Sequence, residues 1–101
     1  MRSVVISRNP DILTGMRLAG MEGVLIKDRS QLMETLKLRV SDAGTGIIIL
    51  THDAMVLAEN EIMEMKLKTR EKLIIEIPDF GGVMEDRMSK YIRDSIGIKI
   101  D

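Results

Sequence analysis

The chain has 101 residues, 45% hydrophobic and 31% charged, and its 15 Lys and Arg nearly balance its 16 Asp and Glu. This length allows one small domain with a single core, and a net charge of −1 with one Tyr, one Phe and no Trp argues against nucleic-acid binding. The absence of Cys excludes disulfides and thiolate metal sites. No apolar run suits a signal peptide or a membrane span. The composition predicts a small soluble domain inside the cell.

Four short runs of mostly β-branched residues predict strands at 4–6, 24–26, 47–50 and 73–75. Continuous apolar runs of this kind are typical of strands that are buried on both faces of a parallel sheet. Longer segments with helical spacing separate them. This alternation predicts an α/β fold with an open four-stranded parallel sheet in the order 2-1-3-4, flanked by helices, in a receiver-like Rossmann topology.

Capping residues predict where the first two helices begin and end. Asn9 followed by Pro10 is a typical helix start, and Gly20 is a typical residue just beyond a helix end. Asp28 or Ser30 can begin the second helix.

A third helix is predicted to start at Thr51 or Asp53 and to run on as one element. Its apolar positions are spaced for one helix face, at Met55, Ala58, Ile62 and Met65. The strongest break follows at 78–82, where Pro78 precedes the pair Gly81-Gly82.

This break divides the chain into a receiver-like domain at 1–80 and a flexible Gly-Gly segment with a C-terminal helix at 81–101. Residues on one stripe of that helix are apolar or aromatic, and we call them the C-terminal stripe: Met84, Met88, Tyr91, Ile92 and Ile96. The stripe either packs back onto the chain's own sheet or docks on a partner helix. Docking is favoured because the apolar character continues through Ile98 and Ile100, which is unusual for a free terminus.

Ligands of open parallel sheets bind beyond the carboxyl ends of the strands, and the loops there carry no known cofactor motif. Neither the glycine pattern of dinucleotide-binding folds nor that of a P-loop is present. His52 is the only histidine and is predicted to be a solvated residue in a loop or at a helix start. Glu76 could be a buried catalytic carboxylate, but a solvent-facing position on an edge strand or at a helix start is favoured. We therefore predict no catalytic set, no metal and no cofactor.

A receiver domain is the enzyme-like alternative for this topology. It needs an acidic pair after the first strand and a phosphoacceptor Asp at the end of the third. Ser7 and Arg8 stand at the first place, and Asp53 comes a few residues late for the second. The pattern disfavours phosphotransfer.

The segment Asp11-Ile12-Leu13-Thr14-Gly15-Met16-Arg17-Leu18-Ala19-Gly20 resembles the first helix of the F subunit of the V/A-type ATPase or ATP synthase. The resemblance continues at 46–51, 73–78 and 95–100 and so covers nearly the whole chain. Members of that family often carry Gly-Asp where this chain has Ser7-Arg8, and Glu where it has His52.

The resemblance implies a non-catalytic rotor component that binds the D subunit in the central stalk, inside the hexamer of A and B subunits. Such a component helps to couple ATP synthesis or hydrolysis to transport of H⁺ or Na⁺. The resemblance also implies a cytoplasmic protein, peripheral to the membrane without insertion, with neither a nucleic acid nor a small-molecule substrate.

The C-terminal stripe is the expected contact with the D subunit. Arg17 is either a surface residue paired with a carboxylate such as Asp11, or a contact that orients the sheet domain in the complex. The alternative function is a stand-alone, receiver-like regulatory binding module without phosphotransfer.

Overall fold

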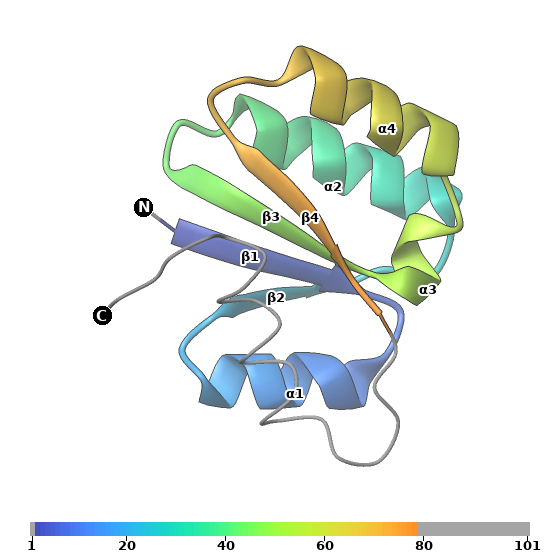
Figure 1. Cartoon of the computed structure of the whole chain (residues 1–101). Helices are drawn as coiled ribbons and strands as arrows, with labels where there is room; N and C mark the ends of the chain where they lie inside the picture. Colours follow the sequence, from blue (N-terminus) through green and yellow to red (C-terminus); the bar gives the residue numbers. More distant parts are fainter. Residues whose placement is uncertain (1, 79–101) are drawn as a thin grey trace.

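The computed structural model describes residues 2–78 of the chain, drawn in colour in Figure 1. Strands and helices alternate along this range almost throughout. The elements in chain order are β1 (Arg2–Ser7), α1 (Pro10–Leu18), β2 (Glu22–Leu25), α2 (Arg29–Ser41), β3 (Thr45–Thr51), α3 (His52–Met55), α4 (Glu59–Lys68) and β4 (Leu73–Ile77).

The four strands form one sheet in the order β2-β1-β3-β4, and every neighbouring pair is parallel. The register places Val5 of β1 beside Gly23 of β2 and Ile49 of β3, and Ile49 beside Ile75 of β4. The predicted α/β class and the predicted strand order are confirmed.

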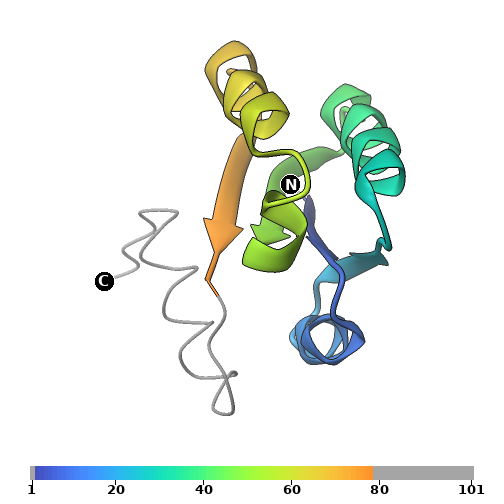
Figure 2. The same ribbon diagram turned by 90° about the vertical axis from the view of Figure 1, so that its right-hand side faces the viewer.

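Helices cover both faces of the sheet, as Figures 1 and 2 show: of the described helices, α1 lies on one face and α2 and α4 on the other. Side chains alternate between the faces along each strand. Val4 and Ile6 of β1 therefore join the core under α2, α3 and α4, whereas Val5 joins the core under α1. Residues of the α1 core include Ile12, Leu13, Met16, Ile49, Ile75 and Ile77.

The predicted caps of the first two helices are present. Asn9 is the N-cap of α1, and its side-chain oxygen accepts a hydrogen bond of 2.9 Å from the Asp11 N–H. Gly20 follows the end of α1 with a φ of 89°, a conformation that favours glycine. Asp28 caps α2 by accepting a hydrogen bond of 2.9 Å from the Gln31 N–H, so it is Asp28 and not Ser30 that begins this helix.

The third predicted helix is wrong as a single element, because the chain breaks it into α3 and α4. After Met55 the backbone makes tight turns, with the Ala58 N–H donating to the Met55 carbonyl at 3.2 Å. Ala58 then takes a φ of −153°, and α4 starts with the Ile62 N–H donating to the Ala58 carbonyl at 3.0 Å. The apolar spacing persists because Met55, Ala58 and Ile62 all reach the same core.

The expectation of strands buried on both faces is wrong for β2. This strand is at the edge of the sheet, where Glu22 and Leu25 are exposed, Leu25 at 46%, and Gly23 and Val24 are half-buried. Of the predicted run 24–26, only Ile26, just beyond the strand, is fully buried. The strands β1 and β3, with a neighbour on each side, carry the fully buried residues Val5, Ile6 and Leu50. The predicted boundary after residue 80 and the predicted helix at 84–96 lie outside the described residues.

Candidate functional site

The carboxyl edge of the sheet brings two buried hydroxyl groups together. Ser7 ends β1 and Thr51 ends β3, and because these strands are parallel neighbours their last residues meet at one edge. The two hydroxyl oxygens lie 2.9 Å apart, and the two residues are 0% and 1% exposed. Water therefore has little access to either hydroxyl, and their hydrogen bonds must come from the chain itself.

Asp53, at the start of α3, supplies the acceptor for this pair. Its Oδ1 accepts a hydrogen bond from the Thr51 hydroxyl and lies 3.5 Å from both the Ser7 hydroxyl and the Arg8 N–H. The Ser7 oxygen also accepts a hydrogen bond of 3.0 Å from the Asn9 N–H. The carboxylate thus joins the turn after β1 to the turn after β3, which is a structural role.

A second contact at this edge joins His52 to Glu76. The Nδ1 of His52 lies 2.7 Å from Oε2 of Glu76, with side chains 52% and 35% exposed. Of the two predicted places for His52, a loop or a helix start, the structure shows the helix start, and Glu76 is half-buried near the end of β4. Sequence reasoning missed the pairing, although each residue lies near the end of one of two adjacent strands, and that placement is the signal that could have found it.

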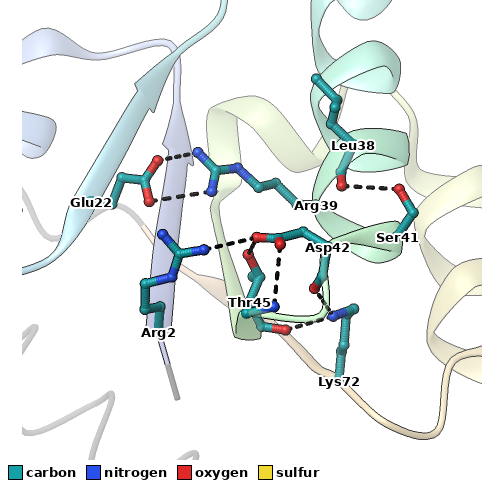
Figure 3. A network of polar contacts seen from close by, with 9 residues as sticks. Arg2, Glu22, Leu38, Arg39, Ser41, Asp42, Thr45 and Lys72 are labelled. Carbon is teal, nitrogen blue, oxygen red and sulfur yellow. Dashed lines mark hydrogen bonds and ion pairs between the residues drawn. The ribbon is translucent and has the colours of Figure 1, made fainter.

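The amino edge of the sheet carries a second polar network, shown in Figure 3. Asp42, just after α2, lies 3.2 Å from the Arg2 guanidinium and accepts a hydrogen bond of 2.6 Å from the Thr45 hydroxyl. The Lys72 ammonium donates to the Asp42 carbonyl and, at 2.6 Å, to the Thr45 carbonyl. The hydrogen bonds from the Thr45 hydroxyl and the Gly44 N–H lower the pKa of the Asp42 carboxyl below its ordinary value.

Arg17 is the predicted site residue that lies within the described range. It belongs to the last turn of α1, and its Nη2 donates a hydrogen bond of 3.2 Å to the Gly23 carbonyl of β2. The described contact is therefore with a backbone acceptor on β2 rather than with the expected carboxylate of Asp11. Two exposed leucines belong to the same two elements, Leu18 at 80% and Leu25 at 46%.

The ionisable side chains of residues 2–78 do not assemble a metal site. Within this range no group of three or more His, Asp or Glu side chains is placed to hold a metal ion. The buried side-chain nitrogen and oxygen atoms of the same range all have hydrogen-bond partners. The buried polar atoms of the two networks therefore have their hydrogen-bond partners within the described residues.

The family model described as ATP synthase (F/14-kDa) subunit matches this chain over residues 4–96. The chain belongs to the ATP synthase (F/14-kDa) subunit family. It is also similar to the F subunit of the A-type ATP synthase of Methanocaldococcus jannaschii, with 32% identity over 89 residues, which is 85% of this chain and 86% of the relative. The resemblance to the F subunit of V/A-type enzymes is thereby confirmed.

Within this member of the family, the motif at 11–20 forms α1 and its glycine end, and it carries both Arg17 and Leu18. The family match extends through Ile96 and so includes the C-terminal stripe, whose residues Met84, Met88, Tyr91, Ile92 and Ile96 lie outside the described residues. In the described part, no helix is long and apolar enough to cross a bilayer.

Proposed function

We propose that this chain is the F subunit in the rotor of a V/A-type ATP synthase or ATPase, where it binds the D subunit in the central stalk. In that place it couples ATP synthesis or hydrolysis to the transport of H⁺ or Na⁺. The observation that carries the proposal is the family match across residues 4–96. The relative from Methanocaldococcus jannaschii, named as the F subunit of an A-type ATP synthase, supports it.

A non-catalytic role is consistent with the chemistry of the described residues. The carboxylate of Asp53 accepts hydrogen bonds from the Thr51 and Ser7 hydroxyls. The carboxylate of Asp42 accepts one from the Thr45 hydroxyl and forms an ion pair with Arg2. Ser7, Thr45 and Thr51 are all buried, so their hydroxyls are not open to a substrate as a catalytic nucleophile has to be. The proposed rotor component works without a cofactor, and its partners are proteins: the D subunit, and the hexamer of A and B subunits around the stalk.

The contact with the D subunit is assigned in this proposal to the C-terminal stripe. Met84, Met88, Tyr91, Ile92 and Ile96 recur at helical spacing, as in an amphipathic helix that lays its apolar side on another helix. Arg17, which ties the end of α1 to β2, would orient the sheet domain in the complex. The proposed position is peripheral, in the soluble sector of the machine on the cytoplasmic side.

The experiment replaces Met88 and Ile92 together by Asp in the full chain and titrates it by calorimetry against the D subunit from the same genome. Two charged side chains at an apolar interface should weaken binding by at least about 100-fold, since buried interface anchors each contribute about 2 kcal/mol or more. The matched control is Met63→Asp, because Met63 is 52% exposed on α4 and lies outside the proposed contact. The control should bind like the wild type.

Two results would count against this proposal. Unchanged affinity of the Met88 and Ile92 double variant would remove the assigned docking surface. Absence of any binding between the wild-type chain and the D subunit would remove the rotor role itself. Circular dichroism of each variant checks that the fold survives, and Tyr91→Ala is the milder replacement if it does not.

A further inference from the structure

The strand β2 has a row of backbone groups that point away from the sheet. It is the first strand in the order β2-β1-β3-β4, and its inner side pairs with β1. The Ile26 N–H donates to the Ser7 carbonyl at 3.0 Å, so Ile26 faces β1. Because backbone groups alternate in direction along a strand, Val24 and Glu22 also face β1, whereas Gly23 and Leu25 face outward. Met21 and Lys27 flank the strand just beyond its two ends. An outward row of this kind is a template for another strand.

The outward carbonyl of Gly23 and the N–H groups of the two flanking residues are hydrogen-bonded by the chain's own helices. The contacts are the Met21 N–H with the Met16 carbonyl at 2.9 Å, the Arg17 Nη2 with the Gly23 carbonyl at 3.2 Å, and the Lys27 N–H with the Gln31 Oε1 at 2.7 Å. One of these bonds comes from the backbone end of α1 and two come from side chains on α1 and α2. The edge of β2 therefore has one carbonyl covered by Arg17, and the backbone N–H groups just beyond its two ends are bonded within the chain.

Gly23 provides the space that the Arg17 side chain needs. A Cβ at this position would lie 3.0 Å from Cδ2 of Leu13, which is tighter than an ordinary contact. It would also lie 3.4 Å from Nε of Arg17, which is at the limit of ordinary contact. Without that Cβ, the Arg17 side chain lies across the strand and reaches the outward carbonyl. The local sequence thus favours this contact from both sides, through an arginine on α1 and a glycine on β2.

We propose that Arg17 and Gln31 block the β2 edge against pairing with the β2 edge of a second copy of this chain, and so keep the free chain monomeric. The other outward residue of β2, Leu25, lies between the covered Gly23 carbonyl and the bonded Lys27 N–H, and it is 46% exposed. Two copies related by a two-fold axis would bring Leu25 against Leu25, which is a self-complementary apolar contact. A net charge of −1 provides little repulsion between copies, so protection has to be local. This inference is independent of the rotor role.

The test compares the full-length wild type with Arg17→Ala, Gln31→Ala and the double variant by sedimentation velocity over a range of concentrations. Lys37→Ala is the control, since it removes one exposed positive charge from α2 without touching the β2 edge. We expect the wild type and the control to stay monomeric. The double variant should dimerise with a dissociation constant at least about tenfold lower than that of the wild type.

A proline at position 25 distinguishes edge pairing from general aggregation. The Leu25 N–H faces outward, so Leu25→Pro removes a donor that a second strand would use and none that β1 uses. Added to the double variant, it should restore the monomer. A double variant that stays as monomeric as the wild type, or dimers that persist with Leu25→Pro, would overturn the proposal. If the double variant does not fold, Arg17→Ala alone is compared with Lys37→Ala, and equal monomer fractions again overturn it.

Discussion

Replacing Thr51 by Val tests whether the buried hydroxyl network holds the carboxyl edge of the sheet together. Valine has nearly the same shape as threonine but lacks the hydroxyl, so the change removes hydrogen bonds with little loss of packing. The hydroxyl donates to Asp53 and lies 2.9 Å from the Ser7 oxygen. Ser7 is 0% exposed, so water cannot take the place of the lost group.

The expected loss of stability follows from these contacts. A buried polar group left without its partner costs about 1–3 kcal/mol. Asp53 keeps the Ser7 hydroxyl and the Arg8 N–H as neighbours at 3.5 Å, so the middle of that range, about 2 kcal/mol, is expected. For a domain of this size, that loss lowers the melting temperature by about 8–16 °C.

The assay is urea unfolding of the full chain, followed by far-ultraviolet circular dichroism. Thr14→Val is the matched control, because the Thr14 hydroxyl donates to the Pro10 carbonyl at 3.0 Å on the exposed side of α1. That variant should unfold within about 0.5 kcal/mol of the wild type. If Thr51→Val is as stable as the wild type, or if Thr14→Val loses as much, the reasoning from burial fails.

Two further predictions concern glycine positions and acid stability. Gly20→Ala should destabilise the chain by about 1–2 kcal/mol because Gly20 has a φ of 89°. Gly15→Ala should instead stabilise the helix by about 0.5–1 kcal/mol because a Cβ there meets nothing within 4 Å. Thermal unfolding measures both changes, and equal changes in stability would contradict the argument. The pKa of Asp42 is lowered from 3.8, chiefly by the Thr45 hydroxyl. Its carboxylate thus stabilises the fold above that pH, and the contribution is lost as the pH falls through the lower native pKa. The difference in urea midpoint between the wild type and Asp42→Asn should therefore shrink on acidification, and a constant difference would refute it.

Much of the fold follows from short-range signals in the sequence. The β-branched runs locate the four strands, and Asn9 and Gly20 bound α1 because a cap and a positive φ are decided by a few adjacent residues. The break between α3 and α4 does not follow, because apolar spacing reports which side chains are buried and not whether the backbone hydrogen bonds are continuous. Met55 and Ile62 reach one core through two helices as well as they would through one.

The candidate site was predicted less completely because its contacts depend on register. The pairing of His52 with Glu76 depends on β3 lying beside β4 with Leu50 opposite Glu76, and composition does not provide that information. Arg17 was found because it belongs to a familiar motif, but its acceptor, the Gly23 carbonyl, is a backbone atom of another element. A backbone acceptor on another element is not identified by the residue types near Arg17, so the sequence offered only a carboxylate such as Asp11 or a contact in the complex as its partner.

Side chains of the chain itself tie both edges of the sheet, and this bears on the proposed rotor role. At the carboxyl edge Asp53 connects the ends of β1 and β3, and at the amino edge Asp42 and Lys72 connect the elements before β3 and β4. Contacts between elements far apart in sequence resist sliding of one strand past the next, because a slip would leave several buried or half-buried polar groups without partners at once. A rotor component that transmits torque has to move as one body. Such a domain, with both edges of its sheet tied by internal hydrogen bonds, suits the mechanical task of the proposed rotor role.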